Sequence, residues 1–491
     1  MKKEINIFWF KRDLRINDNE ALCVALNSEL PLLLVYILEP SLLENNHYSQ
    51  RHFDFIKETL SELKIQLQEM KCHLLCIESE ADPFFEYIFN SYKVNTLFST
   101  QESGIAITYR RDLEIKILCD VNQIVWREFQ NSGVVRGMRN RDQWREKFYS
   151  YMTAPLFEPK FKDFNFLPSN EINEIEGQFK LIDVKTTSHS FQKGGRTEAI
   201  KCAESFFNER IAYYSEYISK PLHSRYGCSR LSPYFAWGVL SIREIYQKAQ
   251  NFKKETNFKK QVNAFCSRLR WQSHFIQKFE MEMRMEFEAV NKGFLNFEQP
   301  INEEYINAWK NGTTGYPLVD ASQRCVAQTG YLNFRMRSLV TSFLTHHLFQ
   351  HFTTGAPWLA QQFLDFEPGI HYGQMQMQAG LTGINTVRIY NPTKNAIEHD
   401  PNADFIKKYL PELKELPNAL AIEPWKVSLM EEEMYNFKYG ETYPERIVNI
   451  EETRKFALKK IYDHRKLLSV KDESERILNT HTLHKTESRF P

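Results

Sequence analysis

The stretch GYPLVDA at residues 315–321 runs on through Arg324 to TGYLNFRMR at residues 329–337. It combines a turn that contains proline, an acidic residue and three arginines, so charged groups crowd against an otherwise apolar segment. The residues that follow predict an amphipathic helix, because apolar side chains recur there at helical spacing. These residues are Leu339, Val340, Phe343, Leu344, Leu348 and Phe352.

Helical periodicity extends over most of the C-terminal part of the chain. It begins after Gly194-Gly195, and we expect an all-helical domain over residues 194–480 and a polar tail over residues 481–491. Residues 136–193 are expected to link this domain to the preceding part of the chain, because residues 150–193 lose periodicity and carry three prolines and a Ser/Thr cluster. The first predicted helix places one set of apolar residues on one face, namely Ile200, Ala203, Phe206, Phe207 and Ile211.

Residues 1–135 have the pattern of an α/β domain instead. Short apolar runs rich in branched residues alternate there with helix-like segments, which predicts a doubly wound sheet of parallel strands with crossover helices. WFKRDLR at residues 9–15 stands where a Gly-x-Gly-x-x-Gly would follow the first run, which argues against a nicotinamide dinucleotide site. The runs are Ile5 to Phe10, Leu32 to Leu38, His73 to Ile77, Val94 to Phe98 and Gln123 to Trp126.

Composition and charge exclude several classes of protein. The chain of 491 residues has a net charge of only +1, so any contact with nucleic acid has to be a local basic patch. Among the eight cysteines only Cys72 and Cys76 lie close together, which fits a tetrahedral metal site poorly and favours buried free thiols. The N-terminal sequence MKKEINIFWFKRD has too short an apolar run for a signal peptide or a membrane span. We expect a soluble, cytoplasmic, monomeric protein without a metal ion.

Three histidines bear on the expectation that the protein has no metal ion. His346, His347 and His351 fall on a predicted helix, and the last two have the spacing of metal ligands. The sequence places no third ligand beside them, and Leu348 and Phe352 interleave with them. A structural role is therefore the favoured interpretation.

The segment GCSRLSPY at residues 227–234 joins small hydroxyl-bearing residues to a predicted helix start. Ser232 is expected to cap this helix, with Pro233 at its first position. Free backbone N–H groups, hydroxyls and an arginine at a helix N-terminus suit a diphosphate, although a capped helix need have no other role.

In these segments the chain resembles the DNA photolyase and cryptochrome family. The resemblance covers about residues 5 to 470 and implies an α/β domain followed by a helical domain that holds FAD. It rests on motifs that stand in the family's order: residues 9–15 with Asn17-Asp18-Asn19, the segment from Ser229 to Ser241, Trp309 with residues 314–317, residues 388–392, Phe405-Ile406 and residues 410–413.

The resemblance implies a set of residues that bind FAD. Asp365 and Arg337 would form a pair beside the isoalloxazine ring, a placement that a buried ion pair between two helices would equally explain. His371 aligns with the residue that faces flavin N5, where it would tune the flavin as a hydrogen-bond or proton donor or would be a packed neutral ring. The implied cofactor-binding residues are Tyr214, Cys228, Ser229, Arg230, Leu231, Ser232, Arg337, Asp365, Phe366, Glu367 and His371.

The family's activity implies a second set of residues that contact DNA. In photolyases a reduced, light-excited flavin donates an electron to a pyrimidine dimer that has left the base stack. Trp271 aligns with the tryptophan that stacks on the lesion and, with His371, is expected to act in catalysis. Arg268, Gln272, Phe334 and Met377 are the other candidate DNA contacts. Phosphate contacts would come from a basic cluster that could otherwise be a solvated helix face: Lys253, Lys254, Lys259, Lys260, Arg268 and Arg270.

The chain also departs from the family pattern. The three tryptophans that commonly carry electrons to the flavin are replaced by Met375, Phe352 and Gln299, so photoreduction by that route should fail. Another route, through Tyr372, Tyr390, Trp358 or Trp309, is left open. Arg268, Gln272 and Phe334 differ from the residues of known repair pockets, which keeps a cryptochrome-like photoreceptor with a signalling partner as the alternative to repair. A protein that binds FAD without light chemistry is a third hypothesis. A second antenna chromophore of unknown identity is expected near residues 101–104.

Overall fold

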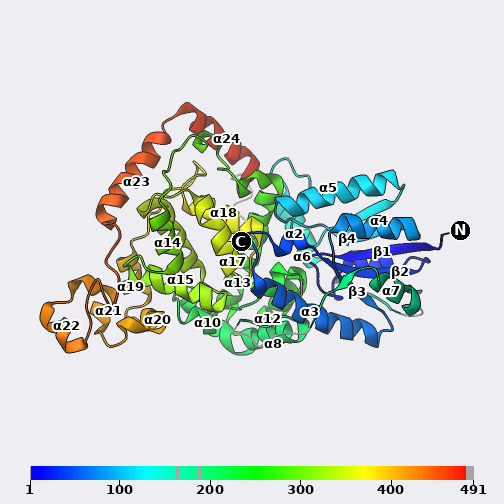
Figure 1. The fold of residues 1–491 in the computed structure, drawn as a ribbon, viewed down its shortest axis with the longest axis horizontal. Helices are drawn as coiled ribbons and strands as arrows, with labels where there is room; N and C mark the ends of the chain where they lie inside the picture. Colours follow the sequence, from blue (N-terminus) through cyan, green and yellow to red (C-terminus); the bar gives the residue numbers. More distant parts are fainter. Residues whose placement is uncertain (1, 162–164, 185–190, 483–491) are drawn as a thin grey trace.

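The computed structural model describes residues 2–161, 165–184 and 191–482, and within them a sheet near the N-terminus adjoins a larger helical part (Figure 1). The sheet has six strands in the order β5-β4-β1-β2-β3-β6. Strands β1 to β5 pair in parallel, and β6 pairs antiparallel with β3 at one edge. The predicted α/β fold class is confirmed. The strands are Glu4–Phe10 (β1), Leu32–Leu38 (β2), Leu74–Glu78 (β3), Lys93–Thr100 (β4), Val125–Phe129 (β5) and Lys180–Leu181 (β6).

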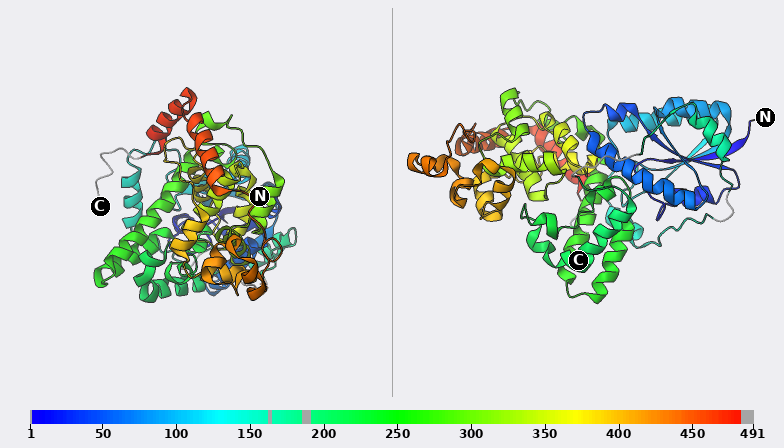
Figure 2. Two further views of the ribbon diagram at one scale, coloured as in Figure 1. Left: turned by 90° about the vertical axis from the view of Figure 1, so that its left-hand side faces the viewer. Right: turned by 60° about the horizontal axis from the view of Figure 1, so that its bottom comes forward.

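Both faces of this sheet are covered by helices (Figure 2), which explains its nearly continuous apolar strands. All seven residues of β2 are buried. Alternate strand residues enter two different cores: Phe8 packs in the cluster that contains α3 (Gln50–Glu69), and Trp9 packs in the cluster that contains α4 (Ala81–Ser91). The other helices of this part are α1 (Glu20–Leu26), α2 (Pro40–Leu43) and α5 (Ala106–Val121).

Residues 136–193, predicted to be a linker, include three regular elements among the residues that the structure describes. Helix α6 (Trp144–Thr153) buries Trp144, and α7 (Ser169–Glu176) packs Ile172 and Ile175 against the sheet. Strand β6 also falls in this segment, so it is more than a surface connection. Residues 162–164 and 185–190 lie outside the described residues.

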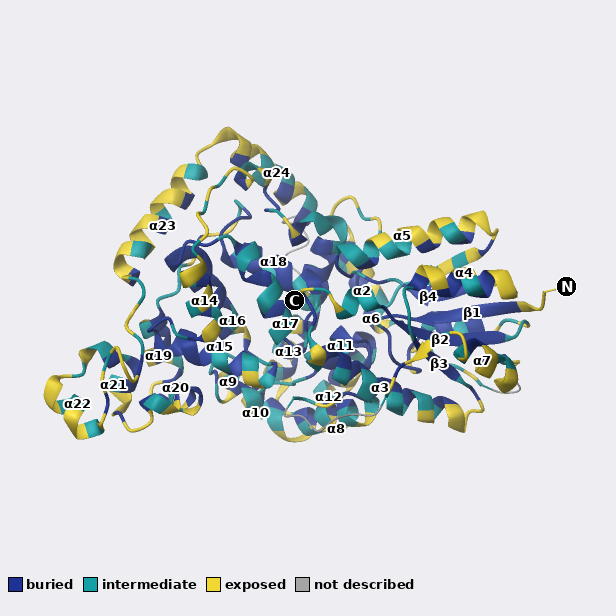
Figure 3. Cartoon of the chain, in the orientation of Figure 1, coloured by how far each residue is buried: buried dark blue, intermediate teal, exposed yellow. Residues whose placement is uncertain are grey.

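The helical part surrounds a buried centre (Figure 3). Its first helices are α8 (Arg196–Ser205), η1 (Phe206–Arg210), η2 (Ile211–Tyr213), α9 (Tyr214–Tyr217), α10 (Ser224–Gly227), α11 (Ser232–Ala236), α12 (Ile242–Glu255), α13 (Lys259–Met281), η3 (Met283–Glu286), η4 (Lys292–Phe294), α14 (Glu303–Asn311), α15 (Pro317–Thr329), α16 (Phe334–Ser342), η5 (Phe343–His347) and η6 (Phe352–Thr354). They are followed by α17 (Ala356–Gln362), α18 (Pro368–Gln378), α19 (Pro392–His399), α20 (Asp404–Tyr409), η7 (Pro411–Leu413), α21 (Asn418–Ile422), η8 (Pro424–Lys426), α22 (Leu429–Tyr435), α23 (Ile450–His464) and α24 (Leu468–His481).

Two glycines bring α13 and α18 close together at this centre. A Cβ atom added to Gly369 would lie 2.6 Å from the Cα atom of Ile276, and one added to Gly373 would lie 2.9 Å from the ring of Phe275. Residues without a side chain are therefore needed where α18 crosses α13.

The predicted helix over residues 339–352 is shorter than expected. Helix α16 passes into a π-helical turn, η5, and Phe349 adopts a left-handed backbone with φ of 51°. The apolar periodicity continues because Phe352 packs in the same core. The predicted tail begins within α24, and residues 483–491 lie outside the described residues. None of the helices in the described part of the chain is both long and apolar enough to cross a membrane.

Candidate functional site

An ion pair joins the two segments that were expected to meet at the flavin. Arg337 on α16 donates from Nη2 to both carboxylate oxygens of Asp365, at 2.8 and 2.9 Å. Burial alone would raise the pKa of Asp365, but Arg337 and the hydroxyl of Ser232 hold it below its usual value. The guanidinium of Arg337 also stacks on Phe363, 3.9 Å from the ring centroid. The predicted pair is confirmed, and it presents a fixed negative and a fixed positive charge side by side.

The hydroxyl-rich segment before α11 lies next to this pair. Ser232 begins α11 rather than capping it: Leu231 is the N-cap residue and forms no side-chain capping hydrogen bond. The prediction of a Ser232 cap was therefore wrong, and the Ser232 hydroxyl instead helps to lower the pKa of Asp365. The carbonyl oxygens of Cys228 and Ser229 both accept hydrogen bonds from Arg210, which holds this backbone in place.

Arg230 combines two features that are typical of a ligand-binding residue, an uncommon backbone conformation and a buried donor without a protein partner among the described residues. Its φ of 61° is in the left-handed region, which is uncommon for a residue with a side chain. Its guanidinium stacks on Tyr331 at 3.6 Å from the ring centroid and donates from Nη2 to Gln192 at 3.1 Å. The buried Nη1 atom has no protein partner among the described residues. An acceptor such as a diphosphate would satisfy it.

Tyr214 lies at the start of α9 and is buried. Its ring packs edge-on against Phe206 and Phe265, at centroid distances of 5.6 and 6.0 Å. Arg210 and Tyr331 contact residues 228–230, although the sequence did not indicate either as a site residue. Their residue types gave no signal, because each acts through a contact with a segment distant in sequence.

His371 on α18 is held as a neutral ring. Burial lowers its pKa to about 3, and its Nε2 atom lies 2.9 Å from the carbonyl oxygen of Ala356. Since a carbonyl only accepts, Nε2 carries the proton and Nδ1 is an acceptor. The ring packs edge-on against Phe366 and Tyr372, at 5.3 and 5.2 Å. These contacts favour the packed neutral ring over the proton donor.

Glu367 connects the helical part to the sheet, a contact that the sequence analysis did not foresee. Burial raises the pKa of this carboxyl to about 7, although Arg12 opposes the shift. Arg12 lies 3.5 Å from Glu367 and donates to the carbonyl oxygens of Phe366 and Ala236, at 2.8 and 2.9 Å. The only sequence signal was WFKRDLR itself, a charged turn directly after a buried strand.

The residues predicted to contact DNA divide between two places. Trp271 on α13 is 45% exposed and Phe334 is 39% exposed. Arg268, one turn before Trp271, has its guanidinium 5.7 Å from the centroid of Phe334. Gln272 lines a cavity next to Glu367 instead, and Met377 on α18 is half-buried. Trp271, Arg268 and Phe334 thus form one partly exposed aromatic and basic surface.

The histidines of η5 are bound to protein groups. His347 contacts the Thr453 hydroxyl at 2.9 Å and the Tyr390 carbonyl at 3.0 Å with its two ring nitrogens. His346 contacts Ser342 at 3.0 Å, and burial lowers the pKa of both rings. Within the described residues no group of three or more potential ligands could hold a metal ion.

The positions that lack tryptophan are filled by packing or by hydrogen bonds. Met375 and Phe352 are buried, and Gln299 donates to the carbonyl oxygens of Thr345 and Gln350, both at 3.2 Å. A different aromatic residue is well placed for oxidation: the hydroxyl of buried Tyr372 is hydrogen-bonded to His47 Nε2. Burial lowers the pKa of His47 to about 4, so this ring is a neutral base.

Two separate parts of the chain match models of known protein families. Residues 6–154 match a family model described as DNA photolyase, and residues 265–463 match one described as the FAD binding domain of DNA photolyase. Asp365, Arg337 and His371 fall within the second match. The buried free donor of Arg230 and the Asp365–Arg337 pair fit such a cofactor.

Similar proteins include both photolyases and cryptochromes by name. The chain is 26% identical to a deoxyribodipyrimidine photo-lyase of Vibrio cholerae, over 93% of this chain and 98% of that protein. It is 25% identical to a cryptochrome DASH of Synechocystis sp., over 91% and 96%.

Solved structures with the same fold also include a cryptochrome and photolyases. A Synechocystis cryptochrome superposes with a TM-score of 0.81 at 22% identity, covering 94% of this chain and 99% of that one. A class III photolyase from Agrobacterium tumefaciens has a TM-score of 0.81 at 21% identity, covering 95% and 99%. A Sulfolobus tokodaii photolyase, solved with two FAD molecules, has a TM-score of 0.77 at 25% identity, covering 94% and 100%.

Proposed function

Because the chain belongs to the DNA photolyase and cryptochrome family, we propose that it is a blue-light-dependent FAD flavoprotein that repairs UV-induced pyrimidine dimers in DNA. The observation that carries this proposal is the contact of Asp365 with both Arg337 and Ser232. It brings together the two segments that the family resemblance assigns to the flavin.

The residues of this site have separate roles in the proposed function. Arg230, with its free buried donor, and the backbone of residues 228–232 would hold the diphosphate. Asp365 and Arg337 would orient the ring by charge and hydrogen bonding. His371 would pack beside it as a neutral residue. Bound FAD would supply the light-driven electron chemistry, and the buried surroundings of the site would exclude water.

The DNA contact would lie on the surface that contains Trp271, Arg268 and Phe334. A dimer that leaves the base stack needs an aromatic platform, and Trp271 is exposed enough to provide one. The candidate phosphate contacts at the end of α12 and on α13 are exposed or half-exposed: Lys253, Lys254, Lys259, Lys260, Arg268 and Arg270. A local patch of this kind is compatible with a net charge of only +1.

A cryptochrome-like photoreceptor is the second candidate. Arg268 and Phe334 lie against each other at the expected lesion pocket, which is unlike the repair pockets of the family. This candidate predicts a light-dependent change in protease sensitivity or oligomeric state, and a signalling protein as the partner.

Repair by the purified protein distinguishes the two candidates. Protein with fully reduced flavin is mixed with a dimer-containing oligonucleotide under blue light, and loss of dimer is measured. Trp271→Ala should reduce repair by about 5- to 150-fold, since base stacking contributes about 1–3 kcal/mol per base. Tyr462→Ala is the control, because Tyr462 is also 45% exposed. If the wild-type protein with reduced flavin leaves the dimer intact, repair is excluded.

A further inference from the structure

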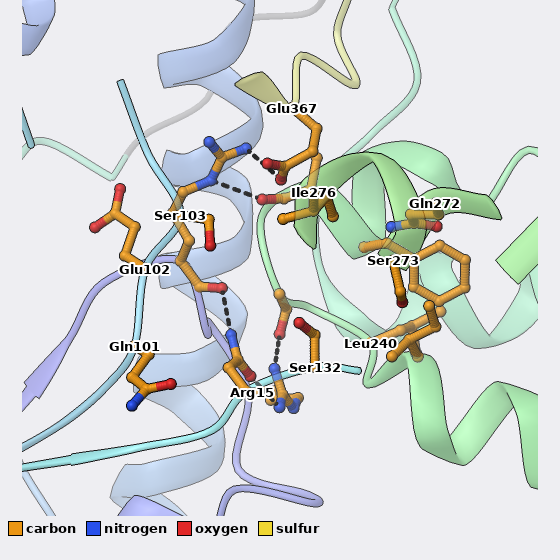
Figure 4. Close-up of a pocket in the computed structure, with 16 residues that line it drawn as sticks. Arg15, Gln101, Glu102, Ser103, Ser132, Leu240, Gln272, Ser273, Ile276 and Glu367 are labelled. Carbon is orange, nitrogen blue, oxygen red and sulfur yellow. Dashed lines mark hydrogen bonds and ion pairs between the residues drawn. The ribbon is translucent and has the colours of Figure 1, made fainter. Parts of the chain in front are cut away.

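A cavity lies where the carboxyl ends of the sheet strands face the helical part (Figure 4). Arg12 and Arg15 line it from the turn after β1, and Gln101 to Ser103 line it from the turn after β4. Ser273 reaches it from α13. Residues 101–104 are where an antenna chromophore was expected, but the chemistry of this cavity suits a smaller ligand.

The position is one where open parallel sheets commonly bind ligands. The chain leaves β1 toward β2 on one side, while β4 pairs with β1 on the other side. The strand order therefore reverses between β1 and β4, and the turns after these two strands diverge around a crevice. Arg12 and Arg15 stand in one of these turns.

Three buried polar atoms from residues that line this cavity have no protein partner among the described residues. They are Arg12 Nη1, Arg15 Nε and Ser273 Oγ. Buried polar groups of this kind are normally hydrogen-bonded, and leaving one unpaired costs roughly 1–3 kcal/mol. The two guanidinium atoms can only donate, and the serine hydroxyl can also donate. The missing partner is therefore an acceptor.

The charges around the cavity favour an anion as that acceptor. Arg15 is 2% exposed, and its guanidinium bonds only neutral acceptors: the carbonyl oxygens of Gly238 and Asp18 and the side-chain oxygen of Asn131. No carboxylate of the described residues lies within ion-pair distance of it. The buried Asp13 carboxylate compensates this cation in part by electrostatic interaction, and an anionic ligand hydrogen-bonded to Nε would compensate it further.

The acidic residues at the cavity are already paired. Glu102 accepts a hydrogen bond from Arg111 at 2.8 Å, and Glu367 lies 3.5 Å from Arg12. Figure 4 shows Arg15 and Ser132 on the side of the cavity opposite Glu367. The cavity volume of about 70 Å³ compares with roughly 10–15 Å³ for one water on the same measure, so it has room for a group of a few heavy atoms.

We propose that this cavity binds a phosphate-like oxyanion, held by Arg12, Arg15 and Ser273. The ligand is either free phosphate or the phosphate group of a mononucleotide. Because Arg12 and Arg15 follow β1 while Ser273 is on α13, the bound anion would also fasten the sheet to the helical part. This inference does not depend on the flavin or on DNA.

Calorimetric titration of the full-length protein with inorganic phosphate, in a buffer free of phosphate and sulfate, tests the proposal. We expect saturable binding and a rise in melting temperature. Ser273→Ala should weaken binding about tenfold, as expected for a lost hydrogen bond to a charged group. It should not lower the melting temperature without phosphate, since Ser273 Oγ has no partner to lose. Ser267→Ala, on the same helix but not lining the cavity, should behave as wild type.

A second variant and a second ligand complete the test. Ser273→Val should abolish binding, because the larger side chain enters the cavity. Titration with AMP separates the two sources: tighter binding than phosphate assigns a nucleotide, and weaker binding assigns the free ion. No saturable binding of either ligand, or equal phosphate affinity in Ser273→Val, would overturn the proposal. The FAD content of each sample, measured by absorbance, keeps this outcome separate from a failure of the proposed function.

Discussion

Arg12 and Glu367 are separated by more than three hundred residues, yet the guanidinium of the first lies 3.5 Å from the carboxylate of the second. Arg12 follows the first strand of the sheet, and Glu367 immediately precedes α18, the helix that carries His371. The sheet is thereby tied to the segment that we propose to contact the flavin.

This contact predicts a pH dependence of stability. Burial raises the pKa of Glu367 to about 7, so the folded protein retains a proton that the unfolded chain releases near its ordinary value of 4.5. The contribution is therefore complete below about pH 4.5 and is lost as the pH rises toward 7. Glu367→Gln should remove this part of the pH profile, up to about 3 kcal/mol between the two limits. Urea unfolding of both proteins at several pH values measures it, with exposed Glu69→Gln as the control. Parallel profiles for wild type and Glu367→Gln would contradict the prediction.

The Asp365–Arg337 pair predicts loss of both stability and cofactor. Arg337→Met leaves Asp365 charged and largely buried without its ion-pair partner, which should cost about 2 kcal/mol, less than for a fully buried pair because Arg337 is partly exposed and Arg230 still acts on Asp365. FAD content, measured by absorbance, should fall as well. Asp365→Asn added to Arg337→Met removes the uncompensated charge and should recover stability but not FAD. Recovery of FAD in the double variant would show that the pair only holds α16 against the segment before α18 and is not needed for FAD binding.

The crossing of α13 and α18 predicts a sharp difference between two glycines. Gly369→Ala should destabilise the protein by about 1–3 kcal/mol, because its Cβ would meet the backbone of Ile276 at 2.6 Å. Gly177→Ala is the matched control, since its nearest neighbour is 3.5 Å away and its φ is −64°. Thermal unfolding followed by circular dichroism measures both. Equal melting temperatures would mean that the two helices separate at little cost.

The missing tryptophans predict slow reduction of the flavin by light. Met375 and Phe352 cannot replace tryptophan as electron donors, and the hydrogen bond of Tyr372 to His47 makes this tyrosine the best-placed substitute. Oxidation of Tyr372 would pass its phenolic proton to His47. Absorbance of the flavin under blue light with a thiol reductant should therefore change slowly in wild type and still more slowly in Tyr372→Phe. Tyr462→Phe, at a tyrosine that is 45% exposed, serves as the control, and an unchanged rate in Tyr372→Phe would remove Tyr372 from the route.

Part of this protein could be predicted from its sequence alone. The five parallel strands were located within a few residues, because a parallel sheet covered on both faces requires continuous apolar runs, whereas the short antiparallel strand β6 was not predicted. The helical nature of the C-terminal part was also predicted, since helical periodicity is a local signal, and the pairing of Asp365 with Arg337 was predicted from the resemblance to the family. The hydrogen bonds of His347 to Thr453 and Tyr390 agree with the structural role that was favoured for this histidine.

The tertiary structure alone decided the rest. The use of the Ser232 hydroxyl by Asp365, the neutral state of His371 and the contact of Arg12 with Glu367 depend on which groups meet across long sequence separations. So does the cavity with its unpaired donors, because Arg15 and Ser273 come from different parts of the fold. Sequence periodicity states which face of an element is buried, but burial, counter-charges and hydrogen-bond partners are set only when the elements pack.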